Sequence, residues 1–146
     1  PKVADFGLSK LLNRNNLNNS SFSMIRGTRG YMAPEWVHNL AITSKVDVYS
    51  YGIVLLEMIT GKSPTSGVQN IDGEDSYNGR LVTWVREKRS GTSCLKHIID
   101  PAMKTNYDEC KMDLLAKVAL ICVEEDKDAR PTMSRVVEML QSHESD

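Results

Sequence analysis

Apolar residues are concentrated in a few segments of the chain, and the densest of these spans residues 44–60. The apolar side chains in this segment cover nearly the whole circumference of a helix. A helix that is apolar on every side is normally buried on every side, so we expect this one to form the axis of the fold. Ser44, with Asp47 three residues later, is suited to cap its start, and Gly61 can supply the left-handed residue that ends it.

Three shorter stretches repeat apolar residues at the spacing of one helix face. They predict helices at residues 81–88, at residues 111–125 and after Arg130, where Thr132 is placed to cap the last helix. Between the first two, residues 95–103 predict a shorter mixed segment. These elements make the chain mainly α-helical.

The remaining segments are extended or polar. Residues 1–12 predict a strand, a tight turn at Gly7 and a second short extended segment. Residues 13–24 read NRNNLNNSSFSM, and such a stretch cannot bury enough apolar area to offset the entropy of ordering it. We expect a mobile surface loop there, and a second loop at residues 61–79, where Gly, Pro, Ser and Asp accumulate.

Composition narrows the class of protein. Of the 146 residues, 40% are hydrophobic and 25% are charged, and the formal net charge of -1 gives no field that favours nucleic acid or an anionic membrane. The cysteines Cys94, Cys110 and Cys122 lie far apart without a CxxC pair, which indicates a reducing compartment and no zinc site.

No uninterrupted apolar run is long enough to span a bilayer. Because the chain opens with Pro1 and without a signal peptide, we expect a segment of a longer polypeptide.

Four short motifs follow one another in a specific order. They are DFG at residues 5–7, GTRGYMAPE at residues 27–35, DVYSYG at residues 47–52 and RPTM at residues 130–133. The interval between the first two is the one that brackets the activation loop of a protein kinase. Each motif alone is a weak signal, but four in this order resemble the large lobe of a protein kinase over essentially the whole chain.

Longer stretches narrow the resemblance further. The segments that carry it read GTRGYMAPEW, SKVDVYSYGIVLLEMITGKSP and DARPTMSRVVEML, and they are similar to plant receptor-like kinases. The residues before APE resemble those of Ser/Thr kinases rather than tyrosine kinases. The fold this implies is mainly α, the C-terminal (large) lobe of the protein kinase fold with a short N-terminal strand-turn. Residues 1–146 would then form one partial kinase domain, with the activation segment at 5–35 and a helical core at 43–142.

The resemblance also implies where ATP and Mg²⁺ bind. Asp5 would ligate the Mg²⁺ that bridges the ATP phosphates, and Phe6 would pack against the other half of the kinase. Gly7 would allow the rotation that distinguishes active from inactive states. The alternative for Asp5 is an ordinary turn-forming residue before glycine.

Further roles follow from the same resemblance. Gly27 and Thr28 would belong to the platform for the protein substrate, with Thr28 facing the substrate hydroxyl and bonding the catalytic Asp; a simple turn residue is the alternative. Glu35 and Arg130 would form a buried ion pair that ties this platform to the helical core, unless each is a solvated surface charge. Asp47 would be buried on its helix, and because its family partners in the catalytic loop are not among these residues, we expect its carboxylate to lack hydrogen bonds.

Candidate phosphorylation sites in or beside the predicted loop are Ser20, Ser21, Ser23 and Thr28. Ser23 matches the usual activating position of the family and has Arg26 and Arg29 nearby, so a phosphate there would order the loop. Most surface serines are simply solvated, and this is the alternative for Ser23; Ser20 and Ser21 are weaker candidates than Ser23.

We therefore expect part of a Ser/Thr protein kinase that transfers the γ-phosphate of ATP to protein hydroxyls in receptor-like signalling. Its parent would be a single-pass plasma-membrane protein with this segment on the cytoplasmic side. The 146 residues contain no glycine-rich phosphate loop, no ATP-binding lysine motif and no His-Arg-Asp catalytic loop, so no catalytic residue is assigned and the segment alone should be inactive.

The expected partners are a protein substrate, ATP, and the small lobe and catalytic loop of the same kinase. Nucleic acid and direct membrane contact by this segment are not expected. Two alternatives remain open: a truncated, non-catalytic kinase-like interaction module, and an unrelated helical scaffold that matches by accident.

Overall fold

A computed structural model describes Lys2, Ala4, Phe6 and residues 27–38, 40–65, 79–91, 95–103 and 106–142. The elements in these ranges are α1 (Pro34–Val37), α2 (Lys45–Thr60), α3 (Gly79–Gly91), η1 (Leu95–His97), η2 (Pro101–Met103), α4 (Glu109–Cys122) and α5 (Met133–Gln141). All of them are helical, which confirms the mainly α prediction. The strand and turn predicted for residues 1–12 lie outside the described residues, apart from three isolated positions.

The long central helix α2 occupies the span that the apolar pattern predicts. Gly61 ends it in the left-handed conformation, with φ 65°, and its N–H donates to the carbonyl of Glu57 at 2.8 Å. The start differs from the prediction, because Ser44 makes no side-chain capping bond. Ser44 already has helical dihedral angles, so its hydroxyl is not placed to cap the helix. The hydroxyl of Thr43 accepts from the N–H of Lys45 instead, at 3.3 Å.

One side of α2 is buried and the opposite side is open. Ile53 and Leu56 are completely buried, whereas Val54 and Met58 are 40% and 65% exposed. Asp47 lies on the same side as these two exposed residues, since it is seven residues before Val54, and it is exposed as well. The prediction of a helix buried all round with a desolvated Asp47 is therefore wrong for the described part of the chain, because none of it packs over this side of α2.

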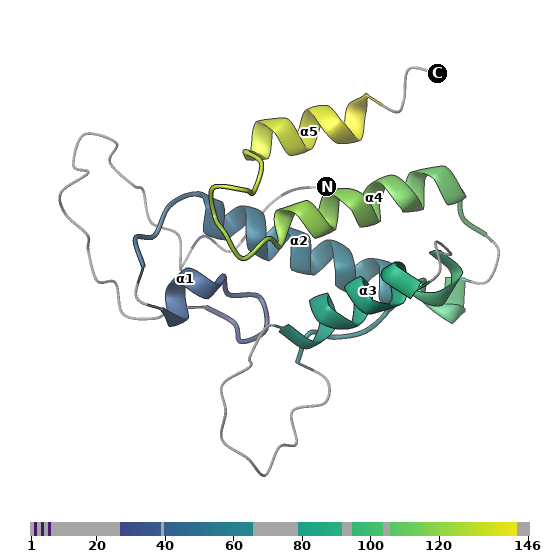
Figure 1. Cartoon of the computed structure of the whole chain (residues 1–146). Coiled ribbons are helices and arrows are strands. Elements are labelled where there is room, and N and C mark those ends of the chain that lie inside the picture. Colours follow the sequence, from purple (N-terminus) through teal and green to yellow (C-terminus); the bar gives the residue numbers. More distant parts are fainter. Residues whose placement is uncertain are drawn as a thin grey trace, which may run out of the picture.

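The core forms where α4 packs along α2, with α5 packed on α4 (Figure 1). Gly52 allows this close approach, because a Cβ at that position would lie 2.7 Å from both the Cβ of Cys122 and Cγ1 of Val123. Ala119 is also completely buried at this crossing. Two small residues thus bring the backbones of α2 and α4 together.

Side-chain caps fix the starts of the last two helices. Asp108 caps α4, accepting from the N–H groups of Cys110 at 2.9 Å and Lys111 at 3.1 Å. Thr132 caps α5 as predicted and accepts from the N–H of Arg135 at 3.2 Å. Among the described residues, no helix is long and apolar enough to cross a membrane.

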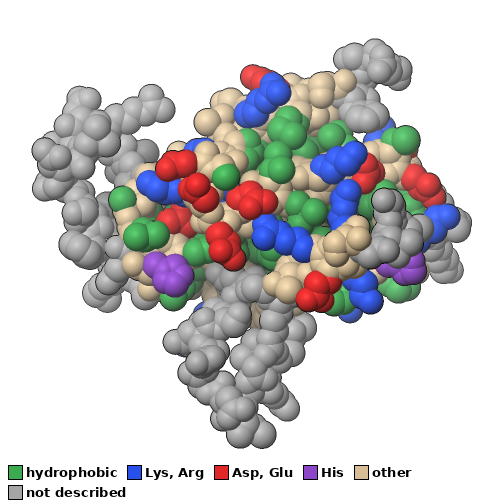
Figure 2. Space-filling model, in the orientation of Figure 1, with side chains coloured by type: hydrophobic (Ala, Val, Ile, Leu, Met, Phe, Trp, Pro, Cys, Tyr) green, Lys and Arg blue, Asp and Glu red, His purple; other side chains and the backbone are tan. Residues whose placement is uncertain are grey.

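Charged side chains of both signs are mixed over the face seen in Figure 2. Exposed ion pairs include Lys96 with Glu109 at 3.5 Å and Arg135 with Glu138 at 2.8 Å. Such exposed pairs contribute little to stability. A buried ion pair, between Glu35 and Arg130, contributes more to the fold.

Candidate functional site

Residues 27–33 form a surface segment that leads directly into α1, and we call it the platform. A turn in this segment joins the N–H of Tyr31 to the carbonyl of Thr28 at 3.2 Å. Gly27 and Thr28, the two predicted substrate-contacting residues, are both exposed. The Thr28 side chain is therefore open to an incoming ligand.

Gly30 packs the platform against the loop that follows α2. Its φ of 91° is a conformation that favours glycine, and the residue is buried. A Cβ at this position would lie 2.8 Å from Cγ2 of Thr65 and 3.3 Å from the ring of Pro64. A larger residue would therefore displace the platform from this loop.

Tyr31 attaches the platform to α2 at two points. Its hydroxyl donates to Oε2 of Glu57 at 2.6 Å, and its carbonyl accepts from the hydroxyl of Ser50 at 2.7 Å. The hydrogen bond to the Glu57 carboxylate, helped by burial, raises the pKa of Tyr31, so its hydroxyl remains a donor. Both the main chain and the side chain of Tyr31 are thereby tied to the core helix.

Glu35 connects the platform to the far end of the chain. It lies on α1, one residue after the Pro34 that opens this helix, and its side chain is 2% exposed. Its two carboxylate oxygens accept from Arg130, at 2.7 Å from Nη1 and 2.9 Å from Nη2. The structure thus places together two residues that are 95 positions apart in sequence.

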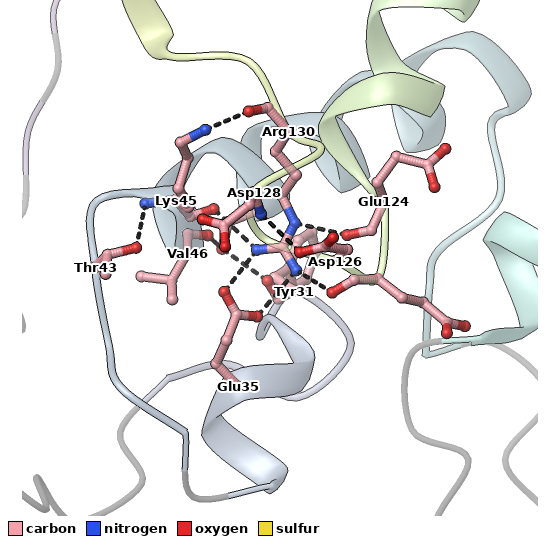
Figure 3. Close-up of polar contacts among 11 residues, drawn as sticks. Tyr31, Glu35, Thr43, Lys45, Val46, Glu124, Asp126, Asp128 and Arg130 are labelled. Carbon is pink, nitrogen blue, oxygen red and sulfur yellow. Dashed lines mark hydrogen bonds and ion pairs between the residues drawn. The ribbon is translucent and has the colours of Figure 1, made fainter.

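The remaining donors of Arg130 all bind backbone carbonyls, as Figure 3 shows for several of them. Nε donates to Glu124 at 2.6 Å, Nη1 to Lys45 at 3.2 Å and Nη2 to Glu125 at 3.0 Å. Lys45 also binds Arg130 in the opposite direction: its ammonium group donates a hydrogen bond to the carbonyl of Arg130. With the two bonds to Glu35, all five guanidinium N–H groups have an acceptor, which is what allows this charge to be completely buried.

Tyr49 of α2 forms one wall of this buried site. The guanidinium carbon of Arg130 lies 4.9 Å from the centroid of its ring, within cation–π range. The ring is 4% exposed. Burial raises the pKa of Tyr49 to about 12, against an opposing effect of the Arg130 charge.

Several predicted site residues lie outside the described residues. They are Asp5, Gly7, Ser20, Ser21 and Ser23. Phe6 is described and is 66% exposed. In the described ranges there is no group of three or more His, Cys, Asp or Glu residues placed to hold a metal ion.

Sequence reasoning missed the residues on α2 that hold the platform. Ser50 and Glu57 are polar positions seven residues apart on a mainly apolar helix, a spacing that puts both on one side. This spacing is the sequence signal from which the two residues could have been predicted to share a partner. Lys45 carried no comparable signal, because a lysine in the first turn of a helix is usually solvated.

Comparison with known proteins agrees with the family that the order of the four motifs indicates. A family model described as the protein kinase domain matches residues 1–141. The chain belongs to the protein kinase family. Within that family it is similar to plant receptor-like kinases over nearly its whole length.

Three such relatives illustrate the similarity. The putative receptor protein kinase ZmPK1 of Zea mays is 43% identical over 144 residues, which are 97% of this chain and 18% of the relative. A G-type lectin S-receptor-like serine/threonine-protein kinase of Arabidopsis thaliana is 42% identical over 144 residues, 96% of this chain and 16% of the relative. Cysteine-rich receptor-like protein kinase 21 of Arabidopsis thaliana is 41% identical over 140 residues, 96% of this chain and 19% of the relative. The chain therefore spans less than a fifth of the length of each.

Proposed function

We propose that this chain is the substrate-binding part of a receptor-like Ser/Thr kinase domain, which transfers the γ-phosphate of ATP to Ser and Thr hydroxyls of proteins. One observation carries the proposal. The platform, which exposes Gly27 and Thr28, is fixed to the helical core in its middle by the bonds of Tyr31 to α2, and the buried Glu35–Arg130 pair fixes the helix α1 that directly follows it. A surface segment held this firmly is suited to receive a peptide in one defined position.

Positioning and electrostatic stabilisation are the main tasks of a protein in phosphoryl transfer, because the loose transition state leaves little covalent chemistry for the protein to perform. In this chain, the platform backbone would orient the substrate peptide. Thr28, which is exposed, would contact the hydroxyl that accepts the phosphate and the catalytic Asp that takes its proton. That Asp, like the ATP-binding lysine, would come from kinase residues that are not among these 146.

ATP and Mg²⁺ would bind at the start of the segment. When bound, the metal would offset negative charge on the ATP phosphates. Asp5 is the residue that we propose as its ligand, with Phe6 and Gly7 beside it. The type of residue supports this role, since Mg²⁺ prefers carboxylate oxygens.

Regulation and location are part of the proposal. We assign Ser23 as the first candidate for activating phosphorylation, followed by Ser20, Ser21 and Thr28. The names of the relatives, which describe receptors, support a membrane-anchored parent. We propose the cytoplasmic side of that membrane for this segment.

The test is phosphate transfer by the complete kinase domain, meaning this segment expressed with the kinase residues encoded upstream in the full-length reading frame. The domain is incubated with Mg²⁺ and γ-labelled ATP, and peptides that contain Ser, Thr or Tyr are compared. We expect label on Ser and Thr, a loss of more than about 100-fold in Asp5→Asn, and no transfer by residues 1–146 alone.

Glu138→Gln is the matched control, since it neutralises a carboxylate that is 62% exposed and pairs with Arg135 on the surface of the described structure. It should transfer phosphate at the unsubstituted rate. A folded complete domain that transfers no phosphate, or that keeps full activity in Asp5→Asn, would overturn the proposal and favour the non-catalytic interaction module.

A further inference from the structure

The hydroxyl of Ser50 bonds outside its own helix. A serine or threonine hydroxyl inside a helix ordinarily donates to the carbonyl four residues earlier. Thr60, on the same helix, does this at 2.8 Å from the carbonyl of Leu56. Ser50 lies 3.1 Å from the corresponding carbonyl of Val46 but only 2.7 Å from the carbonyl of Tyr31. Since a hydroxyl has one proton, the shorter distance favours the bond to the platform.

This bond acts together with the one at the other end of Tyr31. Glu57, which accepts from the Tyr31 hydroxyl, is seven residues after Ser50, so the two lie two turns apart on one side of α2, about 10 Å along its axis. Two bonds at this separation fix both the position and the direction of Tyr31. The Ser50 bond is the one that holds the main chain.

We infer that Ser50 is a positioning residue for the protein substrate: through the Tyr31 carbonyl, its hydroxyl holds the platform main chain in the conformation that presents Gly27 and Thr28. This inference rests on the proposed kinase function. Without the hydroxyl, the Tyr31 carbonyl loses its side-chain donor, and the main chain of the turn between Thr28 and Tyr31 is no longer bonded to α2, although the Tyr31 hydroxyl still binds Glu57. Peptide binding would then have to order the platform as well, whereas ATP binding would not.

The experiment compares three variants of the complete kinase domain. Ser50→Ala removes the hydroxyl, Ser50→Thr keeps it, and Thr60→Ala removes a hydroxyl of the same helix that has no bond to the platform. Peptide and ATP are each varied in steady-state assays. We expect Ser50→Ala to raise the KM for peptide about three- to tenfold, the effect of one lost hydrogen bond, while the KM for ATP stays the same.

The two other variants separate positioning from stability. We expect both Ser50→Thr and Thr60→Ala to keep the unsubstituted KM for peptide. A general loss of stability would lower the active fraction, and hence the apparent kcat, without a selective change in the KM for peptide. An unchanged KM for peptide in Ser50→Ala, or an equal rise in Thr60→Ala, would overturn the inference.

Amide hydrogen exchange at residues 29–33 provides a readout that does not depend on catalysis. Exchange in this segment should be about three- to tenfold faster in Ser50→Ala and unchanged in Thr60→Ala. If the unsubstituted domain transfers no phosphate, the proposed function fails and these exchange rates decide whether Ser50 holds the platform. Equal rates in Ser50→Ala and the unsubstituted domain would show that it does not.

Discussion

Arg130 binds Glu35 through two parallel hydrogen bonds, Nη1 to Oε1 at 2.7 Å and Nη2 to Oε2 at 2.9 Å, and both side chains are buried. The pair joins α1, directly after the platform, to the turn that precedes α5. Two charges can be buried together only because each satisfies the other and the remaining guanidinium donors bind carbonyls. Removal of one partner therefore leaves the other charged and unsatisfied inside the protein.

We predict that Glu35→Gln lowers the free energy of unfolding of the kinase domain by about 3–5 kcal/mol, the usual effect of leaving one buried charge without its partner. Urea denaturation followed by circular dichroism measures it. The loss should appear as a lower midpoint with an unchanged slope, because the surface exposed on unfolding stays the same.

An exposed pair of the same chemistry serves as the control. Arg135 and Glu138 are 2.8 Å apart, and their side chains are 65% and 62% exposed. Arg135→Gln should change the free energy of unfolding by less than about 0.5 kcal/mol. A Glu35→Gln variant as stable as this control would contradict the role assigned to the buried pair.

The helices could be predicted because their causes are local. The span of α2 follows from its run of apolar residues and from Gly61, and the start of α5 follows from Thr132. The cap of α2 was assigned to the wrong residue because the choice between Thr43 and Ser44 depends on backbone angles that the residue types do not determine.

The contacts of the site, in contrast, join residues that are distant in the sequence. The apolar pattern does not link Glu35 to Arg130, so only the resemblance to kinases suggested that pair. The apolar pattern also misled, since it predicted α2 to be buried on every side and Asp47 with it, whereas Asp47 is exposed. The bonds of Tyr31 to α2 depend on how the platform folds back over the helix, and a polar residue on an apolar helix shows only that some partner exists.

Gly30 should tolerate no side chain. We predict that Gly30→Ala raises the KM for peptide and lowers stability by about 1–3 kcal/mol, because alanine is strained at a φ of 91° and its Cβ would meet Cγ2 of Thr65. Steady-state kinetics and urea denaturation measure the two effects. Thr65→Ser in the Gly30→Ala background removes the colliding methyl group, so part of the loss should return. No recovery in this double variant would assign the whole loss to backbone strain.

Thr28 should matter for chemistry and not for folding. Its side chain is exposed, so Thr28→Val should leave the free energy of unfolding within about 0.5 kcal/mol of the unsubstituted value. Loss of a hydrogen bond to a charged catalytic group should lower kcat about 10- to 100-fold. Thr28→Ser keeps the hydroxyl and should retain most of the rate. If Thr28→Val phosphorylates peptide at the normal rate, Thr28 is a turn residue only.

Tyr49 should make the domain sensitive to alkaline pH. Burial raises its pKa from 10.0 to about 12 in the folded protein, so the folded state holds the phenol proton more tightly than the unfolded state. This contribution to stability is complete below pH 10 and is lost as the pH rises from 10 to about 12. By the same linkage, the loss is of the order of 2 kcal/mol.

Tyr49→Phe removes the titrating hydroxyl and keeps the ring that lies against Arg130. Urea denaturation of both proteins at several pH values between 9 and 12 isolates the effect, because every other titrating group is shared. The unsubstituted domain should lose about 2 kcal/mol more than Tyr49→Phe over this range. Parallel stability curves for the two proteins would mean that the Tyr49 hydroxyl has the same proton affinity when folded and unfolded, and that its burial beside Arg130 does not govern alkaline unfolding.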